Sequence, residues 1–174
     1  MLSPYQVRHF QEYRRVFSHA FVHADWMHLA FNMFVLYEFG STVARDLGQL
    51  QGAWAFPMLY SAGILGGALP SLFRHADNPS YRSLGASGAV SAVLLAFICL
   101  HPTTTLLLFF VIPVPAVVAG VLFFWYENRM QQRGKTGIAH DAHIGGALVG
   151  VGWVFLSVPG TWSNFVLAFQ SLLD

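Results

Sequence analysis

The chain has 174 residues, of which 55% are hydrophobic and only 10% are charged, whereas about 25% are charged in an ordinary soluble domain. A soluble core cannot absorb this many apolar runs, so membrane lipid is the expected environment. The formal net charge of +1 offers no basic surface, and we therefore exclude a nucleic-acid partner. The single Cys99 lies in an apolar run and is predicted to be a buried hydrophobic residue.

Residues 1–20 contain no apolar run long enough to cross a bilayer and are predicted to form an extramembrane or interfacial lead-in. Five hydrophobic segments follow, each judged against the roughly 20 residues that a spanning helix needs. They cover about residues 26–43, 53–73, 84–100, 106–126 and 142–158. Because no alternation of period two persists, we expect helices throughout, with Pro57, Pro113 and Pro115 kinking the spans that contain them.

The expected fold is therefore all-α, a polytopic transmembrane helix bundle of about five spans. We expect one domain over residues 1–174, with the bundle at about 26–158 and a C-terminal tail at 159–174. Helices in lipid pack closely through small residues. Gly146 and Gly150, four residues apart in the fifth segment, predict that this segment packs against the glycine-bearing third segment.

Ionisable and polar side chains inside a membrane are costly and indicate function. His28 and Asn32 are four residues apart, so on a helix they share a face and could donate hydrogen bonds to a developing oxyanion. The alternative is that both form hydrogen bonds between helices.

A second candidate is Ser87, which follows Gly85 and precedes Gly88 at the start of an apolar run. The glycines allow close backbone approach, and the amide of Ser87 would lie at a helix start, where unpaired N–H groups favour negative charge. The alternative for Ser87 is a packing role. His143 opens the fifth segment and could act as general base for this serine.

Two neighbours of His143 are given no catalytic role. Asp141, two residues away, would face elsewhere on a helix and is not assigned to a triad. His140 is expected to be a loop-end histidine without a function.

A nucleophile, a base and an oxyanion-binding pair form the minimal set for acyl transfer. This combination resembles the rhomboid family of intramembrane serine proteases. The matching motifs are His28-x-x-x-Asn32, Gly85-x-Ser87-Gly88 and Ala142-His143-x-x-Gly146-x-x-x-Gly150. The resemblance implies a Ser87–His143 dyad without an acid, an oxyanion site of His28, Asn32 and the Ser87 amide, and supporting roles for Gly85, Gly88, His23, Arg15, Gly146 and Gly150.

The sequence departs from the family pattern at several positions. Ser91 stands where many relatives have a tyrosine that packs on the catalytic histidine, which leaves the orientation of His143 open. Ala44 stands where many relatives have a glutamate, and Arg14 where a tryptophan is common. The resemblance also implies a rhomboid-like core lacking the family's first span.

By the same resemblance we expect a serine endopeptidase that cleaves transmembrane or membrane-anchored polypeptides and needs no metal or cofactor. The expected location is a bacterial cytoplasmic membrane, with an active site open to the extracytoplasmic side. That orientation would place eight of the nine basic residues outside, against the positive-inside tendency.

Two other functions remain open. One is a catalytically inactive rhomboid-like protein that binds transmembrane segments, and the other is a histidine-rich membrane transporter or metal-binding protein using His19, His23 and His28. The sequence decides neither the natural substrate nor the oligomeric state.

Overall fold

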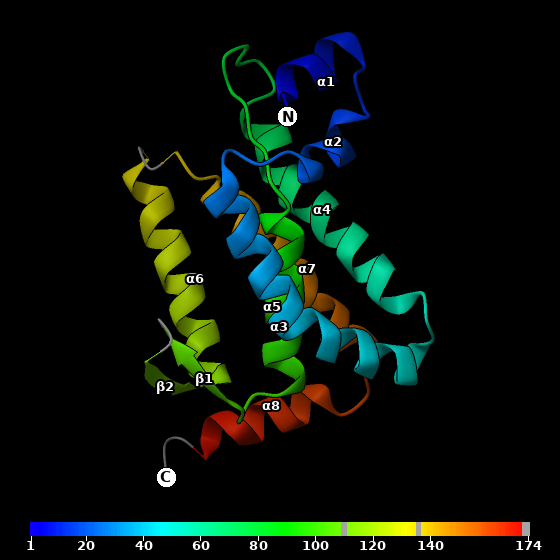
Figure 1. Cartoon of the computed structure of the whole chain (residues 1–174), viewed down its shortest axis with the longest axis vertical. Helices are drawn as coiled ribbons and strands as arrows, with labels where there is room; N and C mark the ends of the chain where they lie inside the picture. Colours follow the sequence, from blue (N-terminus) through cyan, green and yellow to red (C-terminus); the bar gives the residue numbers. More distant parts are fainter. Residues whose placement is uncertain (109–110, 135–136, 172–174) are drawn as a thin grey trace.

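The computed structural model describes residues 1–108, 111–134 and 137–171. The helices and strands, in chain order, are α1 (Pro4–Phe10), α2 (Arg15–Ser18), the 3-10 helix η1 (His19–Phe21), α3 (Trp26–Gln51), α4 (Ala55–Arg74), α5 (Ser87–Leu100), β1 (Thr105–Leu108), β2 (Ile112–Pro115), α6 (Ala116–Arg133), α7 (His140–Ser157) and α8 (Thr161–Gln170). Helix α5 runs through the middle of the bundle, in contact with α3, α4 and α7 (Figure 1). The prediction of an all-α helical bundle is confirmed.

The fourth predicted segment, residues 106–126, is wrong in its first half. Residues 105–108 and 112–115 pair as the antiparallel strands β1 and β2, with Thr105 opposite Pro115 and Leu107 opposite Pro113. Prolines at 113 and 115 cannot donate backbone hydrogen bonds, which prevents a helix there. Helix α6 begins directly after Pro115, because a proline at the start of a helix loses no intrahelical bond.

Pro57 does not interrupt its helix either. It lies in the first turn of α4, which begins at Ala55, and the N–H groups of a first turn have no intrahelical partner. The proline inside α4 is instead Pro70, close to the end of that helix.

Helix α5 packs on α7 through direct contact between backbones. A Cβ atom added to Gly146 would overlap the carbonyl oxygen of Gly88, and one added to Gly150 would overlap the carbonyl oxygen of Ala92. On its other side α5 meets α4, where a Cβ on Gly63 would lie 2.9 Å from the Cα of Ala89. The predicted packing of the fifth segment on the third is therefore confirmed.

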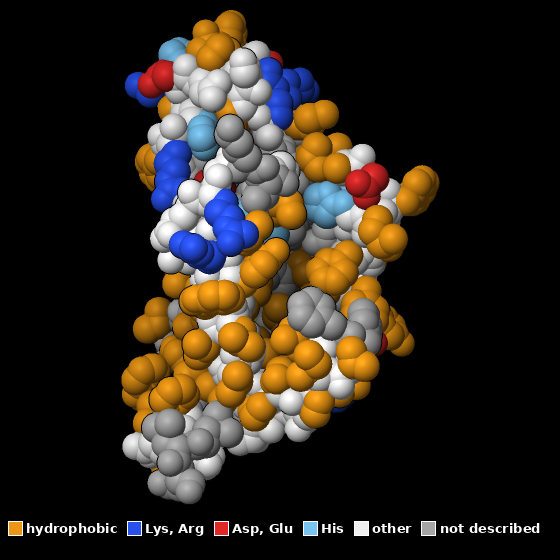
Figure 2. Space-filling view, turned by 90° about the vertical axis from the view of Figure 1, so that its left-hand side faces the viewer, with side chains coloured by type: hydrophobic (Ala, Val, Ile, Leu, Met, Phe, Trp, Pro, Cys, Tyr) orange, Lys and Arg blue, Asp and Glu red, His pale blue; other side chains and the backbone are white. Residues whose placement is uncertain are grey.

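The outer surface of the bundle is rich in large apolar side chains. Leu156 is 91% exposed, Trp26 84% and Phe73 80%. In Figure 2 hydrophobic side chains cover the lower part of one face, and the basic side chains gather towards the upper end. By length and composition, α4 is long and apolar enough to cross a membrane. Helices α7 and α8 reach the same length and hydropathy only when they are taken together, and they are bent by 113° relative to each other. Among the described residues this gives one such helix, or up to two, fewer than the five expected.

The lead-in is attached to the loop that precedes α5. Leu2 forms an antiparallel bridge with Ser83, and the N–H of Gly85 donates to the carbonyl oxygen of His19 at 3.1 Å. Nδ1 of His19 lies 3.2 Å from the carbonyl oxygen of Arg15, and the imidazole is 7% exposed. Residues 1–21 thereby hold the backbone just before the first turn of α5.

The α5–α7 contact predicts a sharp difference between two glycines of α7. Gly146→Ala should destabilise the protein by about 1–3 kcal/mol, because its Cβ meets a backbone carbonyl that cannot rotate away. Gly152→Ala is the matched control: nothing lies within 4 Å of its Cβ position, so alanine should be neutral or stabilising by about 0.5–1 kcal/mol. The measurement is unfolding in mixed detergent. Equal stabilities would contradict the packing described.

The buried imidazole of His19 predicts a pH dependence of stability. Burial lowers the pKa of His19 below its ordinary value of 6.5, so the unfolded chain binds this proton more readily than the folded chain. Stability should therefore fall as the pH drops below about 6.5, and level off once the pH passes the lowered pKa. Thermal unfolding of His19→Gln, which lacks this group, should depend less on pH over the same range. Identical pH profiles of the two proteins would exclude this role for His19.

Candidate active site

Ser87 is the first residue of α5 and is partly exposed. The preceding Gly85 has φ of +109°, a conformation that residues with side chains rarely adopt. This turn delivers the serine at the helix N-terminus, where the first N–H groups have no intrahelical acceptor and the helix dipole favours an anion.

His28 lies directly against this turn. Its Cε1 and Nε2 atoms are 2.7 and 2.8 Å from the position that a Cβ on Gly85 would occupy. Its Nδ1 accepts a hydrogen bond of 3.4 Å from the N–H of Ala24. Since Nδ1 is the acceptor, the ring proton belongs on Nε2, which makes His28 a donor beside the serine turn.

Asn32 lies one turn further along α3 and is 3% exposed. Its Nδ2 donates to the carbonyl oxygen of His28 at 2.8 Å. This hydrogen bond of Asn32 thus stays within its own helix. One N–H of the amide is engaged in this way, and the amide holds the backbone that carries His28.

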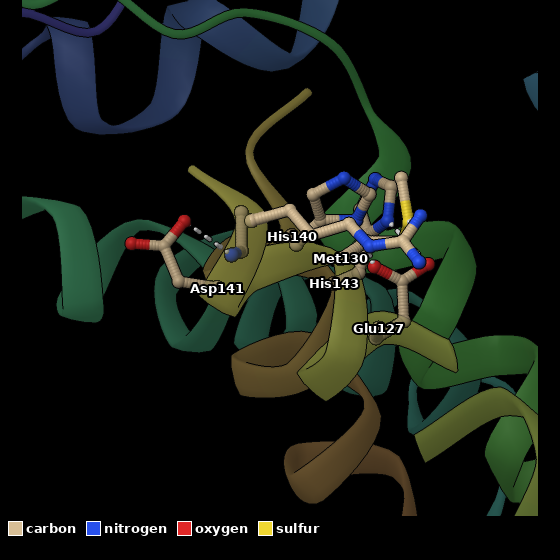
Figure 3. A network of polar contacts seen from close by, with 7 residues as sticks. Glu127, Met130, His140, Asp141 and His143 are labelled. Atoms are coloured by element: carbon tan, nitrogen blue, oxygen red, sulfur yellow. Dashed lines mark hydrogen bonds and ion pairs between the residues drawn. The ribbon is translucent and has the colours of Figure 1, made fainter. Parts of the chain in front are cut away.

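His143 belongs to a polar cluster that joins α7 to α6 (Figure 3). Its Nδ1 lies 3.0 Å from Oε1 of Glu127, and Nδ1 of His140 lies 2.6 Å from Oε2 of the same carboxylate. Glu127 is 6% exposed and His140 is 4% exposed. His140 was expected to lie at the end of a loop, and this placement is wrong. His140 is the first residue of α7 and is a buried partner of Glu127.

Glu127 is the site residue that the sequence reasoning missed. The signal was a single acid at the end of an apolar segment, a position where a charge is costly unless it is paired. Asp141, by contrast, lies away from the cluster, as expected (Figure 3). Its Oδ1 accepts from the N–H of Ala142 at 2.9 Å, and its Oδ2 is 3.9 Å from Arg74.

The first turns of α5 and α7 meet at the same end of the bundle. A Cβ on Gly67 of α4 would lie 3.0 Å from both the Cα of Gly88 and the carbonyl oxygen of Ala142. A cavity of about 10 Å³, room for about one water, is lined among others by Ser87, Gly88 and Ala142. Within the described residues no hydrogen bond joins Ser87 to His143, a contact that often tightens only when substrate binds.

Glu127, His140 and His143 could also hold a metal ion. Each offers one ligand atom, and the three atoms lie within 4.8 Å of one another. Two imidazoles and a carboxylate are a donor set that suits zinc. The same atoms already bond to one another, so the geometry itself requires no ion.

Two further residues were expected to have supporting roles: Arg15, which lies in the lead-in, and His23, which follows it. The rings of His23 and His28 are 5.1 Å apart in an edge-on arrangement, and Nε2 of His23 is buried without a hydrogen-bond partner among the described residues. Arg15 forms an ion pair with Glu12 and donates to the carbonyl oxygen of Met1 at 3.2 Å. Arg15 therefore stabilises the lead-in itself.

A helical bundle rich in exposed apolar side chains, with a serine at the start of a central helix and a histidine of α3 against the glycine turn before it, is the arrangement of a helical membrane protein with a polar site inside the bundle. The Rhomboid domain family matches residues 10–160, and the chain belongs to the rhomboid family. Members of this family are in general intramembrane serine proteases acting on transmembrane substrates.

Three relatives illustrate the similarity. RHOMBOID-like protein 12, mitochondrial, of Arabidopsis thaliana is 39% identical over 75% of this chain and 42% of its own length. Rhomboid protein 1, mitochondrial, of Saccharomyces cerevisiae is 37% identical over 79% of this chain and 40% of its own length. The human Presenilin-associated rhomboid-like protein, mitochondrial, is 32% identical over 83% of this chain and 38% of its own length. The chain thus spans about two fifths of the length of these relatives. No solved structure matches the chain.

These relatives correct one expectation. A bacterial cytoplasmic membrane was expected, but the three proteins are named as mitochondrial. Composition and hydropathy report only that a chain prefers lipid, because the hydrocarbon layers of different membranes impose nearly the same helix length.

The contact between His28 and Gly85 predicts a local effect of one methyl group. In Gly85→Ala the His28 ring must rotate away, since its atoms occupy the space of the new Cβ. We expect the ring resonances of His28 to shift in a nitrogen-15 histidine NMR spectrum, assigned with His28→Gln. Gly52→Ala is the control, because Gly52 also has a positive φ, +93°, but no atom within 4 Å of its Cβ position. An unshifted His28 in Gly85→Ala would contradict the contact.

Proposed function

We propose that this protein is an intramembrane serine endopeptidase, with Ser87 as nucleophile and His143 as general base. The observation that carries the proposal is the convergence of three helix segments at one end of the bundle. The start of α5 presents Ser87, the ring of His28 on α3 lies against Gly85, and the first turn of α7 is held on Gly88 by Gly146. The rhomboid family membership supports the same reaction.

The reaction begins when Oγ of Ser87 attacks a peptide carbonyl carbon while its proton passes to Nε2 of His143. The Ser87 N–H and Nε2–H of His28 then donate to the oxyanion, and Asn32 positions His28 through its backbone or contributes its second N–H. His143 gives the proton to the leaving amine, and an acyl-enzyme forms. A water molecule activated by His143 hydrolyses this ester and regenerates the serine.

In this proposal the substrate enters through a groove that reaches the residue before Ser87. It has a volume of about 830 Å³, lies between the end of the lead-in and helices α3 and α4, and reaches Ala86, the neighbour of Ser87. Its walls are mostly apolar and aromatic, including Phe21, Trp26 and Phe56. A transmembrane segment that unwinds locally could lie there with its backbone next to the nucleophile. From the mitochondrial relatives we infer that this chemistry takes place in a mitochondrial membrane.

One observation favours a second candidate, a rhomboid-like protein that binds transmembrane segments without cleaving them. Ser87 and His143 share no hydrogen bond in the part of the chain that the structure describes, and without such a contact the serine would have no base to take its proton. The test below separates the two functions.

The test is labelling of the detergent-solubilised protein with a fluorophosphonate probe, together with cleavage of a transmembrane peptide. We expect labelling at Ser87 that is lost in Ser87→Ala. Labelling and cleavage should fall roughly 10²- to 10⁴-fold in His143→Ala, which removes the base. They should fall roughly 10²- to 10³-fold in His28→Ala, which removes an oxyanion donor.

Ser91→Ala is the matched control, because Ser91 is a buried serine one turn later on the same helix. It should be labelled and should cleave like the unmodified protein. Equal labelling of Ser87→Ala and the unmodified chain would exclude Ser87 as nucleophile. Normal labelling of His143→Ala would exclude His143 as the general base.

A further inference from the structure

The orientation of a catalytic histidine must be fixed, because only one tautomer presents an unprotonated nitrogen to the serine. In this chain the residue four positions after Ser87, one helix turn along α5, is Ser91, a small buried side chain. A serine hydroxyl offers no ring surface on which His143 could stack. Another group must therefore hold the His143 ring.

The Glu127 carboxylate is placed to hold that ring. It comes from α6, a different helix from either member of the proposed dyad, and its Oε1 lies 3.0 Å from Nδ1 of His143. An ionised carboxylate can only accept hydrogen bonds, so Nδ1 of His143 must carry a proton. The neutral ring then keeps Nε2 free, which is the nitrogen that would take the proton of Ser87.

His140 fixes the other side of the same carboxylate. Its Nδ1 lies 2.6 Å from Oε2, so each carboxylate oxygen has its own imidazole partner. His140 and His143 are three residues apart on α7 and therefore share a face towards α6, with ring centroids 6.0 Å apart and planes at 81° (Figure 3). A carboxylate bonded at both oxygens cannot rotate, and it holds His143 in one orientation.

Burial strengthens the electrostatic part of this arrangement. Glu127 is 6% exposed and His140 is 4% exposed, so water screens the carboxylate poorly. When His143 takes the proton of Ser87 it becomes a cation, and the adjacent anion stabilises that cation more strongly than water would. A tether between α6 and α7 alone would need only one of the two hydrogen bonds.

We propose that Glu127 is a positioning residue that converts the Ser87–His143 dyad into a Ser–His–Glu arrangement, with His140 locking the carboxylate. The proposal rests on the proposed protease function. Glu127 holds the proton on Nδ1 of His143 and stabilises the imidazolium, while the proton that moves passes from Ser87 Oγ to His143 Nε2 and then to the leaving amine.

The kinetic test uses the full chain in detergent with a transmembrane peptide substrate. Glu127→Gln keeps the size of the side chain and removes its charge, and kcat should fall roughly 10- to 10⁴-fold with KM changed less than about twofold. Glu127→Asp, which keeps the charge, should retain more activity than Glu127→Gln. His140→Gln should lose less than Glu127→Gln, because the bond between Glu127 and His143 remains.

A control variant separates positioning from stability. Asp46 and His101 form another histidine–carboxylate bond, of 2.7 Å, between α3 and the end of α5. Asp46→Asn therefore breaks a similar tether whose two residues take no part in the proposed catalysis. It should lower the unfolding midpoint without a comparable loss of kcat. A kcat for Glu127→Gln within twofold of that of the unmodified active protein, or a loss matched by Asp46→Asn, would overturn the proposal.

A second measurement does not depend on activity. Nitrogen-15 NMR of histidine-labelled protein, with His143 assigned from His143→Gln, should show neutral His143 protonated at Nδ1, and Glu127→Gln should shift it towards the Nε2-protonated form. A ring already protonated at Nε2 in the unmodified chain would overturn the role of Glu127. If the unmodified protein neither cleaves the peptide nor is labelled at Ser87 while the tautomer result holds, the protease assignment fails and the Glu127–His143 geometry stands.

Discussion

The contact of α5 with α7, backbone against backbone, is the constraint on which the rest of the structure depends. Gly146 meets the backbone of Gly88 so closely that α7 has no room for a side chain there, and Gly150 repeats the contact one turn later against Ala92. Lipid gives apolar helices no reason to associate, so dispersion between closely packed backbones must supply the attraction. The same contact brings the first turns of the two helices to one end of the bundle, where Ser87 and His143 are found.

A second constraint acts at that end through buried charge. Glu127 enters a poorly hydrated region and is held by His140 and His143, which ties α6 to α7. At the turn before α5, His28 fills the space that glycine leaves at position 85, and the lead-in holds the same turn through His19. Packing forces thus set the positions of the helices, and hydrogen bonds set the orientation of the side chains between them.

Much of the fold could be predicted because it depends on local properties. Apolar runs between polar connections gave the helices α4, α5 and α7 with boundaries within about three residues of those observed, and gave the start of α3 but not its end, which lies at Gln51 and not at residue 43. The paired strands β1 and β2, residues 105–108 and 112–115, were missed, since their sequence is as apolar as a spanning helix and only the prolines at 113 and 115 mark them. The predicted compartment, a bacterial cytoplasmic membrane, was also wrong, because hydropathy does not distinguish one membrane from another.

The sequence by itself determined the family, the helical class and the candidate residues Ser87, His143, His28 and Asn32, because each motif is a short spacing on one helix. Only the tertiary structure decided which partner each side chain has. Glu127 and His143 are 16 residues apart on different helices, and no periodicity links them. Asn32 bonds within its own helix although its spacing suited an oxyanion donor equally well. Spacing fixes which residues share a helix face, whereas the packing of one helix on another fixes what that face meets.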